Sequence, residues 1–269
     1  MMIEYLENLP FCPSPIYDTH AHYDFSEFAP YIDELLRELK RYGIGCIINN
    51  AIDLDSSAEG CLELSKKYDF CYSAIGVHPG TVEQTGIIPK KERLIELCKH
   101  DKVVAVGEIG LDYHYSTENK AKQLIAFKME CDVANELGLP VIIHDREAHG
   151  DVFDVIREFK PKGTIHCYSG SAELALKYVD MGLYIGVGGV VTFKNARKLV
   201  ETVEAIPLES ILLETDAPYL SPVPFRSKRC NSAYIYYTAE KIAEIKKTDI
   251  KTVLEITADN ARKLYKVKP

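Results

Sequence analysis

No part of the sequence has the composition of a membrane span: its 269 residues contain no run that approaches about 18 consecutive apolar residues. Residues 1–5 include an acidic side chain and lack the basic and apolar regions of a signal peptide. No linker rich in Gly, Ser or Pro divides the chain, and no internal repeat is visible. We therefore expect one domain over residues 1–269 that resides in the cytoplasm, does not contact a membrane and needs no obligate protein partner.

Positive charge is scarce. The sequence has 32 Lys and Arg residues and 40 Asp and Glu residues, so its formal net charge is −8. Binding to duplex DNA depends on many contacts between cations and phosphates, so this balance excludes a general electrostatic attraction to DNA. Any activity on nucleic acid has to be local, at a metal centre or a small basic patch. Apolar residues make up 46% and charged residues 27%, which is typical of a folded globular chain.

The cysteines lack the spacing of a metal or redox motif, since no two of them form a C-x-x-C pair. Most lie within apolar stretches, as does Cys46 in the segment 44–48. We expect free thiols that behave as small buried hydrophobic residues in a reducing compartment. The eight are Cys12, Cys46, Cys61, Cys71, Cys98, Cys131, Cys167 and Cys230.

Eight short apolar runs rich in β-branched residues predict strands that are buried on both faces, because their apolar character is nearly continuous rather than alternating. They cover residues 16–20, 45–51, 71–77, 103–109, 140–144, 163–167, 183–187 and 210–215.

Helical patterns alternate with these runs. Ile32, Leu35, Leu36 and Leu39 form one apolar stripe, and further stripes lie in 124–134, in 174–179 before Gly182, and in 199–206 before Pro207. Two helices follow the last strand, at 234–246 and 249–265, the second with Asp249 as N-cap.

Eight strand–helix units in about 260 residues favour a single (β/α)8 TIM barrel with an extra C-terminal helix. The alternative is an open doubly wound sheet. No Gly-x-Gly-x-x-Gly segment follows the first strand, which weakens the nucleotide-binding version of that alternative.

Polar residues of one chemical kind stand at the predicted carboxyl ends of five strands. A parallel barrel brings these ends together at its active-site face. His20 and His22 are two residues apart on an extended chain, so their side chains share one face. The full set is His20, His22, Glu108, His144, His166 and Asp216.

A buried group of imidazoles and carboxylates is unstable unless a cation compensates it. Four histidines and two carboxylates can hold one or two divalent ions, and two ions need a carboxylate to bridge them. A lone histidine in a strand is more often a satisfied core residue, but coincidence at five strand ends favours a metal centre. The donors suit Mg, Mn or Zn, and the absence of cysteine from the set argues against a closed structural zinc site.

The remaining histidines do not share this pattern. His100 and His149 fall at surface positions of helices or loops, and His114 lies beyond the fourth strand. His78, in Gly76-Val77-His78-Pro79, ends the third strand, where it can reach a substrate or serve a structural role in the loop.

At these residues the sequence resembles the TatD-type deoxyribonuclease family, a branch of the metal-dependent amidohydrolase-like TIM barrels. The ordered set of motifs spans essentially the whole chain. Most specific are GEIGLDY at 107–113 and ETDAPYL at 214–220; the others are DTHAH at 18–22, GVHP at 76–79, PVIIHDR at 140–146 and HCYSG at 166–170.

The resemblance implies a divalent-metal-dependent nuclease, often a 3′→5′ exonuclease on DNA and sometimes acting on RNA. It implies two metal ions per subunit: one held by His20, His22 and Asp216, the second by His144 and His166, with Glu108 as the bridge. The sequence departs from the family after Pro224. There the cations Arg226, Lys228 and Arg229 are kept, but an Asn-Glu-Pro element is missing, which puts loop shape and substrate preference in doubt.

The mechanism we expect is attack on a phosphodiester by metal-activated water, with Asp216 as general base and Glu108 as the second catalytic carboxylate. Arg226, Lys228 and Arg229, together with Arg146, are candidates to hold phosphate. Tyr113 and Tyr168 are candidates to stack on an unpaired base, although packing is the commoner role for such residues. His78 completes the candidate substrate-binding set, and DNA with single-stranded or frayed ends is the expected partner.

Two other functions stay open. The same barrel could hydrolyse a small amide, ester or phosphoester, which the acidic surface favours. It could also be a metal-binding or interaction module without activity, although all six ligand positions are filled.

Overall fold

The computed structural model describes residues 9–268. The prediction that residues 1–5 do not begin a signal peptide falls outside the described residues. Eight parallel strands form one sheet in the order β1-β2-β3-β4-β5-β6-β7-β8. Their bounds are β1 Ile16–Ala21, β2 Ile44–Asn50, β3 Cys71–Ala74, β4 Val103–Asp112, β5 Val141–Arg146, β6 Gly163–Ile165, β7 Tyr184–Val187 and β8 Ile211–Leu213.

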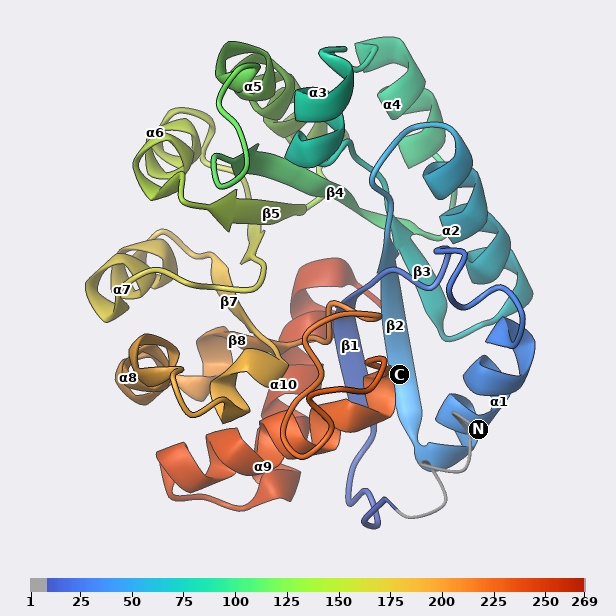
Figure 1. Ribbon diagram of the computed structural model, residues 1–269, viewed down its shortest axis with the longest axis vertical. Helices are drawn as coiled ribbons and strands as arrows, with labels where there is room; N and C mark the ends of the chain where they lie inside the picture. Colours follow the sequence, from blue (N-terminus) through green and yellow to red (C-terminus); the bar gives the residue numbers. More distant parts are fainter. Residues whose placement is uncertain (1–8, 269) are drawn as a thin grey trace.

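Helices surround the strands, as Figure 1 shows. They are α1 Ile32–Tyr42, α2 Ser56–Lys67, α3 Pro79–Thr85, α4 Lys91–Cys98, α5 Lys120–Leu137, α6 His149–Phe159, α7 Ala172–Asp180, α8 Arg197–Ala205, α9 Ile235–Lys246 and α10 Ile250–Tyr265. Short 3-10 turns lie at η2 Gly189–Thr192, η3 Leu208–Ser210 and η4 Ser232–Tyr234.

The sheet nearly closes on itself between its first strand and the loop after its last. Ala21 and Ala217 form a parallel bridge, and the His22 amide donates to the Ala217 carbonyl at 2.8 Å. The buried carboxylate of Asp18 accepts from Thr215 Oγ1 at 2.8 Å and from Ser232 Oγ at 2.7 Å, which adds side-chain bonds across the same seam. The predicted TIM barrel is therefore confirmed, and the open doubly wound sheet is wrong because its strand order would not be sequential.

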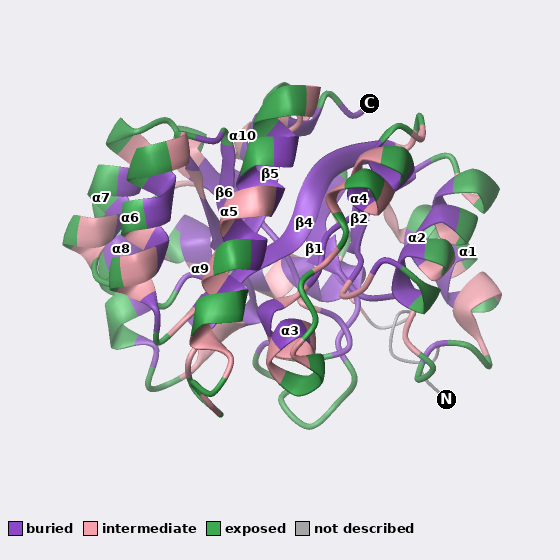
Figure 2. Cartoon of the chain, turned by 90° about the horizontal axis from the view of Figure 1, so that it is seen from above, coloured by how far each residue is buried: buried purple, intermediate pink, exposed green. Residues whose placement is uncertain are grey.

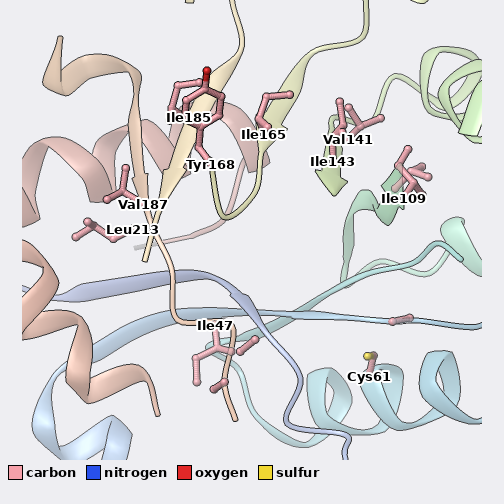
Figure 3. Close-up of a cluster of buried hydrophobic side chains, with 14 of the residues drawn as sticks. Ile47, Cys61, Ile109, Val141, Ile143, Ile165, Tyr168, Ile185, Val187 and Leu213 are labelled. Carbon is pink, nitrogen blue, oxygen red and sulfur yellow. The ribbon is translucent and has the colours of Figure 1, made fainter. Parts of the chain in front are cut away.

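Two apolar layers line the two faces of the strands. The outward layer joins strands to helices: Leu35, Leu36 and Leu39 of the predicted α1 stripe are fully buried against it. Figure 3 shows its members Ile143, Ile165 and Val187 on neighbouring strands. In Figure 2 the helices are buried on their inner side and exposed on their outer side.

A second cluster includes Cys46 and Ile48 from the opposite face of β2 and Tyr265 of α10. The end of α10 lies at the amino ends of the strands, since the Lys268 amide donates to Tyr72 Oη at 3.1 Å. The predicted N-cap of this helix is confirmed, because the Asp249 carboxylate accepts from the Thr252 amide at 2.9 Å. The extra C-terminal helix therefore covers the end of the barrel opposite the polar residues.

The eight cysteines are free, as predicted, and all except Cys12 and Cys167 are buried. Within the described chain, none of the helices combines the length and the apolar composition that crossing a bilayer requires.

Candidate metal centre

The six predicted ligands meet at the carboxyl end of the barrel. His20 lies in β1 and His22 directly after it, Glu108 lies within β4 and His144 within β5. His166 follows β6 by one residue, and Asp216 follows β8 by three. The pairing of β4 with β5 shifts register between Val106 and Ile109, so Glu108 sits at an irregularity of the strand. This convergence was expected from the pattern of strand ends; the role of each residue as a ligand remains a prediction.

Glu108 lies between two groups of histidines. Its Oε2 atom is 3.2 Å from His20 Nε2 and 3.5 Å from His22 Nε2. Its Oε1 atom is 2.8 Å from His144 Nδ1 and 3.9 Å from His166 Nε2. The side chain is 3% exposed. A carboxylate whose two oxygens face different ligand groups has the geometry of a bridge.

Asp216 faces the same histidines from the loop after β8. Its Oδ1 atom is 3.4 Å from His22 Nε2 and 3.8 Å from His166 Nε2. Its amide donates to the His20 carbonyl at 2.9 Å, which anchors the loop to β1. The side chain is 21% exposed, against 3% for Glu108, so it can contact a substrate as well as the buried histidines.

The donors fit divalent cations. Glu108, His20 and His22 form one group whose ligand atoms lie within 4.8 Å of one another, and His20, His166 and Asp216 form another. His20 Nε2 and His22 Nε2 are 3.1 Å apart, and His20 Nδ1 is buried with no hydrogen-bond partner among the described residues. Burial, with the neighbouring His166, lowers the pKa of His20, so its neutral ring has a lone pair to offer.

The grouping of the other ligands differs from the expected partition. The structure places His166 with His20 and Asp216, and the rings of His20 and His166 stack at 3.4 Å between centroids. It places His144 with Glu108 and His78. Which residues would share an ion therefore stays a prediction, while the donor set suits one or two divalent ions with mixed imidazole and carboxylate ligands.

Three candidate ligand rings are held by a second contact on their other nitrogen. His144 Nε2 is 3.1 Å from Asp112 Oδ2, and His166 Nδ1 is 3.1 Å from Glu214 Oε2. His22 Nδ1 is 2.8 Å from the Asn50 carbonyl. The hydrogen bonds of His144 and His22 fix the orientation of those rings, and the contact of His166 with Glu214 is an ion pair.

Sequence reasoning missed Asp112 and Glu214 as part of the centre. Both stand inside motifs that it singled out, GEIGLDY and ETDAPYL, so a signal was present. The fourth strand was expected to end at residue 109, however, and it continues through Asp112. This extension pairs Asp112 with Arg146 of β5 and brings its carboxylate to the His144 ring.

Electrostatics in the centre match this geometry. Burial alone would lower the pKa of His144, but its contacts with Asp112 and Glu108 outweigh burial and raise the pKa to about 9. Burial also opposes the proton on His166, and the Glu214 carboxylate raises that pKa to about 10. Burial would raise the pKa of Glu108, yet the surrounding histidines hold it well below its usual value.

His78 has the structural role in the loop that was left open for it, and its other ring nitrogen faces the centre; contact with a substrate stays a prediction. It is the N-cap of α3, where its Nδ1 accepts from the Gly80 amide at 2.9 Å. Its Nε2 is 3.2 Å from His144 Nδ1 and 3.6 Å from Glu108 Oε1. Burial lowers the pKa of His78 to about 4, so the ring is neutral. An acceptor at Nδ1 leaves the ring proton on Nε2, and this proton faces the centre.

Two cavities open over the centre. One of about 590 Å³ is lined by His144, His166 and Asp216 and extends past Cys167 and Tyr168. The other, of about 350 Å³, is lined by His22, Glu108 and the same three ligands, together with His78.

Arg146 and Tyr115 line both cavities, whereas Tyr113 lines neither. The Tyr113 hydroxyl donates to Asp151 Oδ2 of α6 at 2.8 Å, and Lys120 of α5 lies over its ring. Tyr115, two residues on, is the tyrosine of this loop that borders the centre. Tyr168 borders the larger cavity but is 3% exposed, and its hydroxyl donates to the Ser171 carbonyl at 2.6 Å.

The three predicted cations that follow β8 lie beside the centre rather than in it. Arg226, Lys228 and Arg229 line a neighbouring cavity of about 610 Å³, which shares Tyr219 and Leu220 with the larger cavity over the centre. Arg226 lies over the Phe193 ring at 3.6 Å, and Arg229 donates to the Glu27 carbonyl at 2.7 Å. His114 and His149 pair with Glu147 and Asp145, and neither is in a metal-ligand group among the described residues.

With this geometry established, comparison with known proteins decides the family. The sequence model of the family described as TatD related DNase matches residues 17–266. The chain belongs to this family.

Relatives of this TatD-related chain match it over nearly their full length. The uncharacterized metal-dependent hydrolase YabD of Bacillus subtilis is 38% identical over 256 residues, which cover 94% of this chain and 99% of that protein. The uncharacterized metal-dependent hydrolase YcfH of Escherichia coli is 32% identical, with 93% and 95% covered.

Solved structures agree with the TatD assignment. YjjV, a TatD homologue of Escherichia coli, has a TM-score of 0.88 at 29% identity. The match covers 96% of this chain and 100% of YjjV. A TatD-family hydrolase of Entamoeba histolytica, at 23% identity and a TM-score of 0.84, shares the fold; 95% of this chain and 99% of that one are covered. The protein is thus a TatD-type metal-dependent hydrolase.

Proposed function

We propose that this protein is a deoxyribonuclease that cleaves phosphodiester bonds at single-stranded or frayed DNA ends, in the 3′→5′ direction, with two divalent ions such as Mg, Mn or Zn. The observation that carries the proposal is cationic side chains beside a metal centre on an otherwise acidic chain. Arg146 lines both cavities over the centre, and Arg226, Lys228 and Arg229 line the adjoining one. The name of the family, TatD related DNase, supports the same substrate class.

Bound divalent ions would lower the pKa of water and offset the charge that builds on the phosphoryl oxygens. The protein supplies the proton acceptor and the orientation of the substrate. Burial would raise the pKa of Asp216, but the His22 and His166 rings outweigh it and lower that pKa, so the carboxylate is ionised at neutral pH. Ionised and partly exposed, Asp216 accepts the proton from the attacking water.

Two further residues act on the substrate in this scheme. Arg146 presents a guanidinium whose paired donors match phosphate oxygens. His78, neutral with its proton on Nε2, donates a hydrogen bond to the leaving oxygen, which is the 3′ oxygen of the remaining strand and takes its proton from solvent water. Glu108 stays fixed between the two groups of histidines and keeps their nitrogens directed at the centre.

A labelled single-stranded oligonucleotide tests the proposal. We expect stepwise shortening with added Mg²⁺ or Mn²⁺, and none when a chelator is present. The His100→Ala variant should digest like the wild type, because His100 lies outside the metal-ligand groups of the described chain. Digestion that continues in full with chelator would contradict metal dependence.

One observation favours a second candidate, hydrolysis of a small amide, ester or phosphoester. The cavity of about 590 Å³ over the centre has an apolar wall that includes Val190 and Leu199, which suits a small organic group. Parallel assays on the oligonucleotide, bis-p-nitrophenyl phosphate and an amide panel separate the two. Turnover of an amide without cleavage of either phosphodiester would replace the nuclease proposal.

A further inference from the structure

Two exposed tyrosines flank the metal centre, and neither takes part in the proposed hydrolysis. Tyr115 is 80% exposed and Tyr219 is 51% exposed. Tyr115 follows β4 and Tyr219 follows β8, two strands that stand four places apart in the ring of eight. Both nevertheless line the same two cavities over the centre. Their rings therefore border one opening from opposite sides of the barrel.

Tyr115 contacts a residue that lines the cavities, and Tyr219 is bonded to a residue of the centre itself. The Tyr115 ring lies 4.9 Å from the guanidinium of Arg146. The Tyr219 amide donates to the Asp216 carbonyl at 2.8 Å, so the turn that carries Asp216 also carries this ring. Phe25 contacts the Tyr219 ring edge-on at 6.4 Å and stacks on His22 at 4.8 Å. A molecule bound by the two tyrosines would therefore lie at a fixed position next to the cluster of candidate metal-binding residues.

The two cavities that both rings border have the size of a site for one or two nucleosides. The cavities measure about 590 and 350 Å³, within the range of about 300–1,000 Å³ that small-molecule sites occupy. Large apolar side chains exposed together at a concave site indicate a binding surface. Every nucleobase has two flat π-faces, which aromatic side chains bind by stacking with little regard to sequence.

We propose that Tyr115 and Tyr219 bind the unpaired nucleobase next to the scissile phosphate by stacking on it, and so restrict the enzyme to single-stranded polynucleotide ends. This inference rests on the proposed function, since it takes a DNA phosphodiester as the substrate. The net charge of −8 supplies no general attraction for DNA, so local contacts have to provide affinity. A paired base is stacked within its helix and has to leave it before it can enter between the tyrosines.

The test compares two labelled single-stranded oligonucleotides that differ at one residue. The first carries a normal nucleotide at the digested end, and the second carries an abasic tetrahydrofuran residue there. With the Mn²⁺-loaded enzyme, the ratio of kcat/KM for the first over the second measures the contribution of the base. We expect a ratio of about 5- to 150-fold for the wild type, the range that stacking of one base provides.

The variants separate the ring from its hydroxyl and from its bulk. Tyr115→Ala and Tyr219→Ala should each bring the ratio toward one, and Tyr115→Leu and Tyr219→Leu, which keep apolar bulk without a π-face, should do the same. The Phe variants should retain the ratio because the ring remains. The control Leu176→Ala removes an exposed apolar side chain of α7, outside the two cavities, and should also retain the ratio.

The outcomes distinguish the two proposals. If the wild type cleaves both oligonucleotides with equal kcat/KM, or if the Ala and Leu variants keep the wild-type ratio, the base-binding role is overturned while the nuclease activity stands. If the wild type cleaves neither, the proposed function fails and this inference fails with it.

Discussion

Glu108 is the residue on which the geometry of the centre depends, because its two oxygens face different groups of histidines. Glu108→Gln keeps the shape of the side chain but removes the charge that would hold two cations. Loss of a residue that merely orients a metal ligand costs about 10- to 100-fold in affinity or activity, so we expect a larger loss of hydrolysis here. Digestion of the labelled oligonucleotide measures it. A native circular dichroism spectrum with near wild-type turnover would contradict the bridging role.

Asp112 and Glu214 should act through the rings they contact. Asp112→Asn puts a neutral amide in place of the carboxylate beside His144 Nε2. Glu214→Gln does the same to the carboxylate beside His166 Nδ1. We expect each to weaken metal binding by about 10- to 100-fold. Calorimetric titration with Mn²⁺ measures the affinity directly, so the result does not depend on activity. Unchanged affinity in both variants would leave these carboxylates a structural role only.

Protons compete with metal at the same rings. The pKa of His144 is raised to about 9 and that of His166 to about 10 in the metal-free protein, so both are protonated at neutral pH. A cation needs the neutral ring, hence metal binding should release protons, and apparent affinity should increase as pH rises toward these values. Titration in two buffers of different ionisation enthalpy measures the protons released. Affinity that does not change with pH would contradict this.

At the level of single residues, the sequence located the metal-ligand candidates but not the tyrosine that borders the cavities over them. His20, Glu108 and Asp216 were identifiable because imidazoles and carboxylates at strand ends have few uses other than a cation. Tyr113 and Tyr115 are chemically alike and two positions apart, so only the path of the loop decides which one borders the cavity. That path depends on contacts of Tyr113 with α5 and α6 that no local pattern encodes.

Among the elements, helix α5 supports the loop that carries His78. Glu130 of α5 is fully buried, and its Oε1 accepts from the Val77 amide at 2.8 Å. Glu130→Ala leaves that amide without a partner, which should cost about 1–3 kcal/mol of unfolding free energy. Urea denaturation measures it, with Glu130→Gln as the control that keeps an acceptor. Equal stability of the Ala and Gln variants would contradict the support role.

Glu130 should also make the free energy of unfolding depend on pH, in a direction that its pKa shift determines. Burial raises the pKa of Glu130 well above its usual value, so the folded state binds its proton more tightly than the unfolded state does. Its contribution to stability is fully present below the unfolded pKa and is lost as pH rises through the folded one. Glu130→Gln should therefore gain stability relative to the wild type between about pH 5 and about pH 8. A constant difference across that interval would show that the carboxyl does not titrate on unfolding.

Element order could be predicted from the sequence far better than element length. Continuous apolar runs locate strands that are covered on both faces, so all eight were identified. Their ends depend on pairing: β4 continues to Asp112 because β5 runs beside it through Arg146, and β8 stops at Leu213, before the loop that carries Asp216. The helices α2, α3, α4 and α6 were not located individually. Helix α3 has only seven residues, too few for an apolar stripe to show.

On the scale of the whole molecule, metal binding at the centre should stabilise the folded barrel. Its buried cluster holds carboxylates beside protonated imidazoles, and a bound cation would displace the imidazole protons and take their place beside the carboxylates. A ligand that binds only the folded state adds about 2.7 kcal/mol when its concentration is one hundred times its Kd. The metal-loaded protein should therefore melt at a higher temperature than the same protein with chelator. Differential scanning calorimetry measures the two melting temperatures.

The variants decide whether that gain arises at the centre. In Glu108→Gln the melting temperature should respond little to Mn²⁺, because the bridging charge is gone, whereas His100→Ala should respond like the wild type. If metal stabilised Glu108→Gln as much as the wild type, the ions would bind elsewhere on this acidic surface. The link between the strand-end cluster and the stability of the barrel would then be lost, because a cation on the surface neither displaces the imidazole protons nor contacts the buried carboxylates.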